Sequence, residues 1–317
     1  MSSVRVGVLY DPFDPVNTGH ITFCRSAISG RKLDRVLLIL QDPEGSSCGA
    51  SRTDRWRMLT ASCAVDKSLV PVDTPALSSA LKHKFNADKL ITLSLPSESD
   101  CSLCPSVAEY CEALGLYGHV PTVKNASSHL EKLFSALNPH RFAHSLAVAA
   151  ECRRLAMRFG VDPVKAEEAG LLHDCAKCLP LSDMQKLVLD GGIPAETEVL
   201  ASGGLLHSLA GVLLARSLYG IDDPDILSAI EYHNTGRAGM SKLAMVVCLA
   251  DYIEPNRDPF PNLEETRRLA GISLEKALLF SLENTMDHVL SRGRWLHPRT
   301  QETVQWLRTL PAVTLPD

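Results

Sequence analysis

The spacing of apolar residues changes character at about Asn125, and this change constrains the fold of the 317-residue chain more than any other feature. Before Asn125, short apolar runs alternate with segments of helical spacing. From Leu130 onward, apolar residues recur at helical intervals and no strand-like run follows. A chain of this length is also long for a single core. We therefore expect two domains, an α/β domain over residues 1–125 and an all-helical domain over residues 126–317.

The first domain is expected to contain a parallel sheet. A continuous apolar run such as RVLLIL at Arg35–Leu40 is typical of a strand that is buried on both faces. Strands that alternate with helices favour parallel pairing. The expected strands cover residues 4–9, 35–40, 68–72 and 89–95, and the expected helices cover residues 20–30 and 53–65.

Charge and hydropathy narrow the classes of partner. The net charge of −5 argues against nucleic acid, because binding to a phosphate backbone needs a basic surface. A small anionic substrate remains compatible with this charge if metal ions supply local positive charge. No apolar run reaches the roughly 18 residues of a membrane span, and the N-terminus enters a strand-like pattern without the apolar core of a signal peptide. We expect no membrane partner and a cytoplasmic protein.

The ten cysteines follow no disulfide framework, so most are expected to be small buried thiols in a reducing compartment. One cluster has an alternative interpretation. Cys101 and Cys104 are followed by Cys111 and His119, a set that a zinc ion could use. The segment around Cys111 has the spacing of an ordinary helix, which favours the structural interpretation.

Histidine and aspartate residues form an ordered set in the helical half. Each follows small apolar residues on a predicted helix, and two of them are adjacent in the stretch GLLHDCAK. The set consists of His144, His173, Asp174, His207, His233 and Asp251. A single histidine on an apolar helix face is more often a hydrogen-bonded core residue, and Asp251 alone could be a buried helix cap. An ordered set of six is much harder to obtain by chance.

The position of these residues indicates a metal site. Ligand-type side chains on apolar helix faces point into a helical bundle, where an uncompensated imidazole or carboxylate is costly. A bound cation removes that cost. Neutral imidazole and carboxylate are the usual ligands of zinc, iron and manganese.

The surrounding sequence resembles the HD-domain superfamily of metal-dependent phosphohydrolases. Within that superfamily it is similar to the YqeK-type symmetrical diadenosine tetraphosphate hydrolases. The resemblance covers residues 130–310 and rests on the stretches RFAHSLAVA, AGLLHDCAK, HSLAG, YHNTGR and LADYIEPNR. It implies an all-α HD-domain bundle and the hydrolysis of a dinucleoside tetraphosphate to two ADP.

The resemblance also implies a role for each site residue. His144, His173, Asp174 and Asp251 would hold a first metal, and His207 and His233 a second, with Asp174 bridging and acting as a catalytic residue. Two divalent ions about 3.5–4 Å apart would clamp a phosphoryl group and activate water. The implied metal is iron, with manganese as a substitute. Lys177 would assist catalysis by offsetting polyphosphate charge, and Arg237 and Arg257 would bind phosphate, although a solvated surface role for Lys177 and a structural role for Arg141 stay open.

The N-terminal half carries a second, partial resemblance. FDPVNTGH at residues 13–20 resembles the FDPxHxGH loop of nicotinate-nucleotide adenylyltransferases, which implies a Rossmann-like nucleotidyltransferase fold. Gly19 and His20 keep the pattern, but Asn17 stands where the first histidine belongs, and Asn cannot carry the charge of a proton. An acidic Glu131 lies where the family has an arginine. We therefore expect a degenerate domain with a vestigial nucleotide-binding loop at Asn17, Gly19 and His20.

The leading hypothesis is thus a two-domain hydrolase of a small-molecule nucleotide, with a homodimer left open. Three alternatives remain at this point. The N-terminal domain could retain nicotinate-nucleotide adenylyltransferase activity, which would make the enzyme bifunctional. The HD site could bind nucleotides without turnover as a sensor, although the complete ligand set disfavours this. The hydrolase could also act on another nucleotide, because pocket-lining residues cannot be identified from the sequence.

Overall fold

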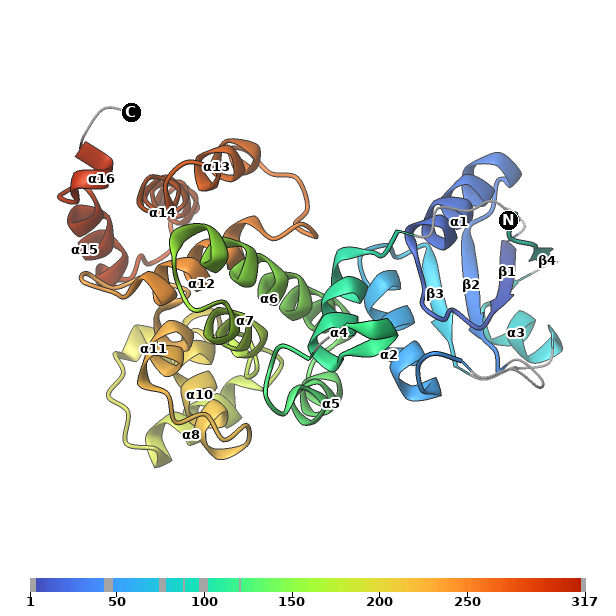
Figure 1. The fold of residues 1–317 in the computed structure, drawn as a ribbon, viewed down its shortest axis with the longest axis horizontal. Coiled ribbons are helices and arrows are strands. Elements are labelled where there is room, and N and C mark those ends of the chain that lie inside the picture. The colour runs from blue at the N-terminus through green and yellow to red at the C-terminus, as the bar shows by residue number, and fades with distance from the viewer. Residues whose placement is uncertain are drawn as a thin grey trace. The chain divides into compact units, whose positions relative to one another are not determined.

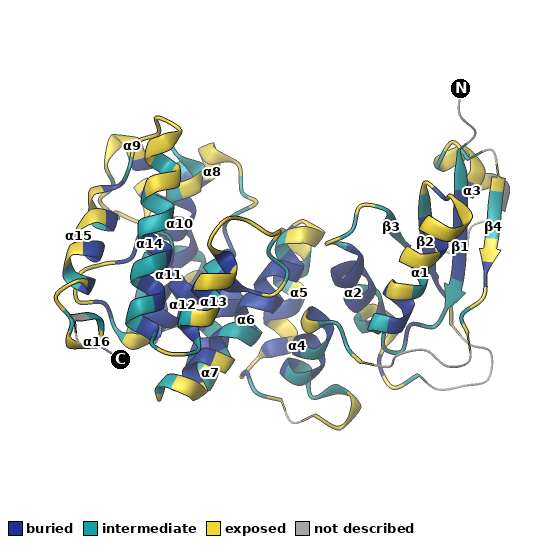
Figure 2. Cartoon of the chain, turned by 90° about the horizontal axis from the view of Figure 1, so that it is seen from above, coloured by how far each residue is buried: buried dark blue, intermediate teal, exposed yellow. Residues whose placement is uncertain are grey.

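The computed structural model describes residues 4–42, 48–73, 78–87, 89–96, 102–119 and 121–314. The chain forms two compact units, Met1–Ser127 and Ser128–Asp317. Each unit has its own cluster of buried apolar side chains. Figure 2 shows these buried positions on the inner faces of the helices and strands, with exposed positions on the outer faces.

The first unit is built on a four-stranded sheet with the strand order β3-β2-β1-β4, in which every neighbouring pair is parallel (Figure 1). The strands are β1 (Arg5–Asp11), β2 (Arg35–Leu40), β3 (Leu69–Val72) and β4 (Lys89–Leu93). Five of the six residues of β2 are buried, as expected for an inner strand covered on both faces. The predicted parallel α/β architecture of this half is confirmed.

Helices connect these strands. They are α1 (Thr18–Arg31), α2 (Arg52–Cys63), α3 (Ser78–Lys84) and α4 (Pro105–Leu114), followed by the 3-10 turn η1 (Leu116–Gly118). Helix α1 begins at Thr18 rather than at the expected His20, because the Asn17 side chain accepts a hydrogen bond from the His20 backbone N–H and caps the helix.

The described residues of the second unit form helices and no strand, so the predicted all-helical architecture is confirmed. The longer helices are α5 (Ala126–Ala136), α6 (Pro139–Phe159), α7 (Pro163–Leu172), α8 (Leu181–Asp190), α10 (Gly203–Ser217), α11 (Pro224–Tyr232), α12 (Lys242–Ile253), α13 (Leu263–Ala270), α14 (Leu274–Ser291) and α15 (Pro298–Leu307). Two short helices, α9 (Thr197–Leu200) and α16 (Pro311–Thr314), complete the unit. No helix in the described part of the chain is long and apolar enough to cross a membrane.

Helix α6 packs against α7 and α12, and these three helices form the centre of the bundle. Gly170 on α7 allows the closest part of this contact. A Cβ atom at Gly170 would lie 2.7 Å from the Sγ atom of Cys152 and 3.1 Å from the Cα atom of Ala149, both on α6. Because any larger residue would push the two helices apart, Gly170 sets the distance between the two helices that carry His144 and His173.

Candidate metal centre

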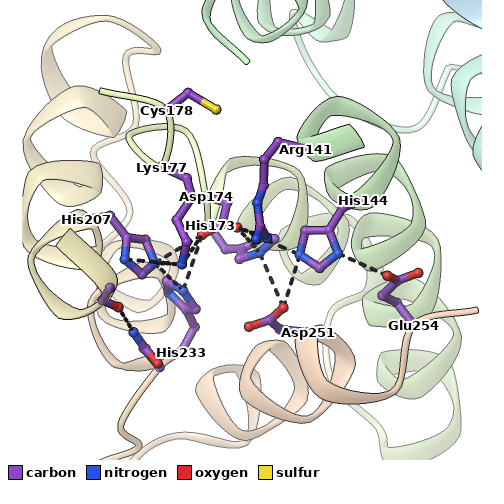
Figure 3. Close-up of polar contacts among 12 residues, drawn as sticks. Arg141, His144, His173, Asp174, Lys177, Cys178, His207, His233, Asp251 and Glu254 are labelled. Atoms are coloured by element: carbon purple, nitrogen blue, oxygen red, sulfur yellow. Dashed lines mark hydrogen bonds and ion pairs between the residues drawn. The ribbon is translucent and has the colours of Figure 1, made fainter. Parts of the chain in front are cut away.

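The structure brings together all six of the predicted ligand residues. They come from five helices or helix ends, and their side chains point toward one another (Figure 3). Helix α6 carries His144, the C-terminus of α7 carries His173 and is followed by Asp174, α10 carries His207, the C-terminus of α11 carries His233, and α12 carries Asp251. Five of the six are at least 97 % buried, and the side chain of Asp251 is 24 % exposed.

Asp174 lies in the middle of the group. Its Oδ2 atom is 3.8 Å from Nε2 of His144 and 3.6 Å from Nε2 of His173. Its Oδ1 atom is 3.0 Å from Nε2 of His207 and 3.8 Å from Nε2 of His233. Each oxygen of one carboxylate therefore faces a different pair of imidazoles.

Asp251 adds a second carboxylate on the side of His144 and His173. Its Oδ1 atom is 3.1 Å from Nε2 of His144 and 3.8 Å from Nε2 of His173. In the described part of the chain, two groups of three side chains have donor atoms close enough to hold one cation. One group consists of His144, His173 and Asp251, and the other of His173, Asp174 and His233.

The other ring nitrogen of each histidine is held by a hydrogen-bond acceptor, which fixes the tautomer. Three Nδ1 atoms lie against backbone carbonyls one helical turn away: His173 with Gly170 at 2.6 Å, His207 with Gly203 at 3.2 Å, and His233 with Ile230 at 2.8 Å. A carbonyl only accepts, so these Nδ1 atoms donate and leave the Nε2 lone pair facing the group. Nδ1 of His144 lies 3.0 Å from a carboxylate oxygen of Glu254. Such outer partners are typical of metal-binding histidines.

Burial and neighbouring charges set the protonation of the donors. Burial lowers the pKa of His207 and of His233 to about 4, so both rings are neutral at pH 7. Burial also lowers the pKa of His173. In contrast, burial disfavours the charged form of His144, but the nearby Asp251 and Glu254 carboxylates outweigh that effect and raise its pKa.

The two carboxylates are ionised. Burial alone would raise the pKa of Asp174, but the His173 and His207 imidazoles and the Lys177 ammonium group around it hold the pKa well below its ordinary value. The pKa of Asp251 is held low in the same way by His144 and by the Arg257 guanidinium. The group therefore offers mostly neutral imidazoles and two anionic carboxylates, which is the donor set of a transition-metal site.

Each carboxylate oxygen of Asp174 has one cationic side chain beside it. Nζ of Lys177 is 3.5 Å from Oδ1 of Asp174 and 3.1 Å from Nε2 of His207. On the opposite side, Nη1 of Arg141 donates to Oδ2 of Asp174 at 2.8 Å. The sequence left a structural role for Arg141 open, whereas the structure places it on the central carboxylate. These positive charges balance the negative charge that the buried group would otherwise carry.

Sequence reasoning also missed Glu254, which is 98 % buried beside His144. The available signal was its spacing. Glu254 follows Asp251 by three residues at the end of α12, and residues at that interval share a helix face. A carboxylate there could have been assigned to the same site.

The two arginines predicted to bind phosphate lie in different places. Nη2 of Arg257 donates to Oδ1 of Asp251 at 2.6 Å, so Arg257 borders the group. Arg237 is exposed, and its guanidinium lies 5.2 Å from the ring centre of Tyr232. Within the described chain, no hydrogen bond or ion pair joins Arg237 to the six donors.

The predicted vestigial residues of the first unit lie at the start of α1. Nδ1 of His20 is 2.6 Å from Oδ1 of Asn17, and Nε2 of His20 is 3.4 Å from Oδ1 of Asp11. Gly19 is buried beside them. The ring of His20 is therefore used in capping the helix and in a contact with Asp11.

The cysteine cluster forms no donor group in the described part of the chain. Neither of the two groups with suitable donor spacing contains a cysteine. Cys111 is buried, and its Sγ atom lies 3.6 Å from the sulfur of Met58. Cys101 lies outside the described residues.

A helical bundle that gathers this ordered set of histidines and aspartates defines a metal-dependent phosphohydrolase of the HD type, and the HD domain model matches residues 141–256. The symmetrical bis(5'-nucleosyl)-tetraphosphatase of Bacillus subtilis is 40 % identical over 171 residues, which cover 54 % of this chain and 91 % of that protein. The chain belongs to this HD family, in the group that includes the Bacillus protein. The membership in the HD-domain superfamily that the sequence predicted is confirmed.

Two further relatives extend the comparison. A crystal structure from Clostridium acetobutylicum, described as a predicted HD superfamily hydrolase involved in NAD metabolism, is 41 % identical with a TM-score of 0.56. The match covers 57 % of this chain and 95 % of that one. A Mycoplasma genitalium protein named probable nicotinate-nucleotide adenylyltransferase/Ap4A hydrolase is 29 % identical over 185 residues, or 56 % of this chain and 48 % of that protein.

Proposed function

We propose that this chain hydrolyses diadenosine tetraphosphate symmetrically to two ADP. The observation that carries the proposal is the position of Asp174, whose two oxygens face two separate pairs of imidazole Nε2 atoms. A carboxylate in this position is suited to bridge two cations that act on one phosphoryl group. The name of the Bacillus relative supports the choice of substrate.

The residues fit a pair of divalent cations. Nε2 of His144, Nε2 of His173 and Oδ1 of Asp174 are buried and make no well-formed hydrogen bond with the described residues, which is costly unless another group binds them. Neighbouring ligands bound to one ion at about 2.0–2.2 Å lie about 3–3.5 Å apart. The distance from His207 Nε2 to His233 Nε2, 3.0 Å, matches this spacing.

We assign His144, His173, Asp251 and Oδ2 of Asp174 to one ion, and His207, His233 and Oδ1 of Asp174 to the other. Iron is the proposed metal, with manganese as a substitute. Divalent ions held there supply positive charge against the transferring phosphoryl group and make water reactive near neutral pH.

The remaining polar side chains act on the substrate charge. A small cavity of about 150 Å³ borders the site and is lined by Arg141, His144 and Arg257, among others. Arg141 and Arg257 place two guanidinium groups beside the donor set, and Lys177 adds an ammonium group on the side of His207. We propose that these cations bind the polyphosphate and hold the reacting phosphorus beside Asp174.

A direct assay tests this function. The full chain is purified without chelator, its bound metal is measured, and diadenosine tetraphosphate is supplied with product identification. We expect about two equivalents of metal, as for two-ion sites, and ADP as the sole product. ATP and AMP as products would contradict symmetrical cleavage, and a metal-loaded chain without hydrolysis would contradict the enzymatic function.

Lys177→Ala is expected to lower kcat by about 10²-fold, because it removes a positive charge that stabilises the transition state. Metal content should stay unchanged, since Lys177 donates no ligand. Steady-state kinetics and metal analysis of the same sample give both values. Lys186→Ala, at a lysine side chain that is 76 % exposed on α8, is the matched control. Loss of metal from Lys177→Ala would mean that its role is structural.

Glu254→Ala is expected to weaken metal binding by about 10–100-fold, because Glu254 orients the His144 ring through its Nδ1 atom. Metal titration of the stripped protein measures the effect. Glu254→Gln should recover part of the affinity, since its amide oxygen still accepts from Nδ1. Glu264→Gln, at a residue whose side chain is 83 % exposed, serves as the control. Equal affinities for Glu254→Ala and the unchanged chain would rule out this orienting role.

For the first unit we propose a degenerate nucleotidyltransferase-like domain over residues 1–125, with a Rossmann-like fold. The parallel sheet and the FDPVNTGH loop after β1 support this assignment. The engagement of His20 by Asn17 and Asp11 supports the loss of adenylyl transfer, because the ring is used inside the unit. The alternative is a bifunctional enzyme, as the name of the Mycoplasma relative suggests for that protein.

We expect the full chain to release no pyrophosphate from ATP and nicotinate mononucleotide. The assay is best run on Asp174→Asn, so that the hydrolase does not consume nucleotides. Our reason is that Asn17 cannot carry the positive charge that a histidine would supply at this loop. Release of pyrophosphate with formation of the dinucleotide would establish the bifunctional alternative.

A further inference from the structure

A cavity in the second unit has a volume of about 710 Å³, which is within the usual range of small-molecule sites. It lies between the end of α12, the loop that leads to α13, and the C-terminal half of α14. Figure 1 shows these segments close together in the same unit. None of the six metal-donor residues lines this cavity.

One wall of the cavity is aromatic. The rings of Tyr252 and Phe260 meet edge to face, with centroids 5.2 Å apart and an interplanar angle of 89°. Phe260 is 37 % exposed, so part of its side chain is open to solvent. A ring placed at an open wall can stack with a flat ligand.

The facing wall is polar. Nδ2 of Asn262 donates to Oδ1 of Asn284 at 2.8 Å. The Nδ2 atom of Asn284 is buried and makes no well-formed hydrogen bond among the described residues, although the Asn284 side chain also interacts with the Tyr252 hydroxyl. Asp287 and Arg292 line the same cavity further along. This wall therefore presents amide, carboxylate and guanidinium groups to the cavity.

These groups match the parts of a nucleoside. A base needs a flat face to stack on and amides that bond its edge, which Phe260 and the Asn262–Asn284 pair provide. Ribose hydroxyls need a strong acceptor, which the Asp287 carboxylate provides. The site would take an adenine through its stacking face and its ring nitrogens.

The cavity shares one lining residue with the smaller cavity beside the metal centre. Phe260 also lines the smaller cavity that contains the donor His144 together with Arg141 and Arg257. On the opposite side, Tyr252 directly follows the donor Asp251 on α12. A ligand whose base stacks at Phe260 can therefore extend its phosphates past the two guanidinium groups toward the donors.

We infer that this cavity binds one nucleoside end of the dinucleotide, with the base on Phe260 and its edge on Asn284. The inference rests on the proposed hydrolase function and names the substrate recognition of that same site. Phe260 and Asn284 thereby determine specificity for a nucleotide over a plain polyphosphate.

The test compares Phe260→Ala and Asn284→Ala with the unchanged chain. We expect the KM for diadenosine tetraphosphate to rise about 10-fold, the effect of losing one stacking contact, with kcat changed less than about twofold. Inhibition by ADP should weaken by the same factor, whereas inhibition by inorganic diphosphate should not change. Phe260→Tyr should restore stacking and KM. Trp295→Ala, at an aromatic residue that is 43 % exposed outside this cavity, is the control.

The outcomes separate the two proposals. If the unchanged chain does not hydrolyse the dinucleotide, the proposed function fails, and calorimetric binding of ADP and diphosphate to the metal-loaded protein still tests the cavity. Unchanged KM and ADP binding in both variants would overturn the nucleoside site. Equal weakening of ADP and diphosphate would also overturn it, because the substitutions would then act through the phosphate region.

Discussion

Asp174→Asn will lose its bound metal and its hydrolytic activity together. The substitution keeps the shape of the side chain but removes the negative charge that faces both imidazole pairs. Losing about 4 kcal/mol of transition-state stabilisation corresponds to about a 10³-fold fall in rate, and losing both ions should cost at least that much. Metal analysis and the dinucleotide assay on the same preparation measure the two effects.

The control for this variant is Asp190→Asn, which removes a surface carboxylate that pairs with Lys186. It should keep full metal content and activity. Circular dichroism should show that both variants are folded, since the amide that replaces each carboxylate has nearly the same size and can still form hydrogen bonds. Retained metal and retained hydrolysis in Asp174→Asn would refute the assignment of Asp174 as the bridging ligand.

Removal of metal by a chelator is expected to abolish hydrolysis, and adding back iron(II) or manganese(II) should restore it. The metal-free chain should stay folded at pH 7. Burial lowers the pKa of His207 and His233 to about 4, so these rings place no charge in the interior, and Lys177 and Arg141 balance Asp174. Activity assays and circular dichroism before and after dialysis test both statements.

A thermal unfolding measurement tests whether the metal acts at these donor residues. The thermal midpoint of the stripped chain should rise with manganese concentration, because a ligand that binds only the folded state stabilises it. The midpoint of Asp174→Asn should not respond. Full activity after exhaustive chelation, or an equal thermal response in both proteins, would contradict a catalytic metal centre at these residues.

Much of the fold could be predicted because each strand or helix has a local cause. The run at Arg35–Leu40 predicts a buried strand, and β2 has these same bounds. The order of the strands is a different matter. β4 comes last in the sequence but lies at the edge beside β1, and no local pattern states which neighbour a strand selects.

The site shows the same division. The six donors could be predicted as one group because each follows buried apolar residues of a helix, and that pattern is visible in the sequence. Arg141 contacts Asp174 and Glu254 contacts His144 only through tertiary packing. The interval from Asp251 could have placed Glu254 at the site, but no sequence pattern names His144 as its partner. Arg237 lies near His233 in the chain, but its side chain is directed onto Tyr232. Closeness in the sequence shows that a residue lies near the site along the chain, but it does not show where the side chain points.

The acceptors that hold the four histidine rings differ in how they are encoded. A main-chain carbonyl is present whatever amino acid the gene specifies, so His173, His207 and His233 keep their ring acceptor through any substitution that preserves the helix. His144 relies on the side chain at position 254, which a single codon change can remove. Of these four ring acceptors, the one beside His144 is therefore the one that a change of amino acid can take away while the helices stay intact.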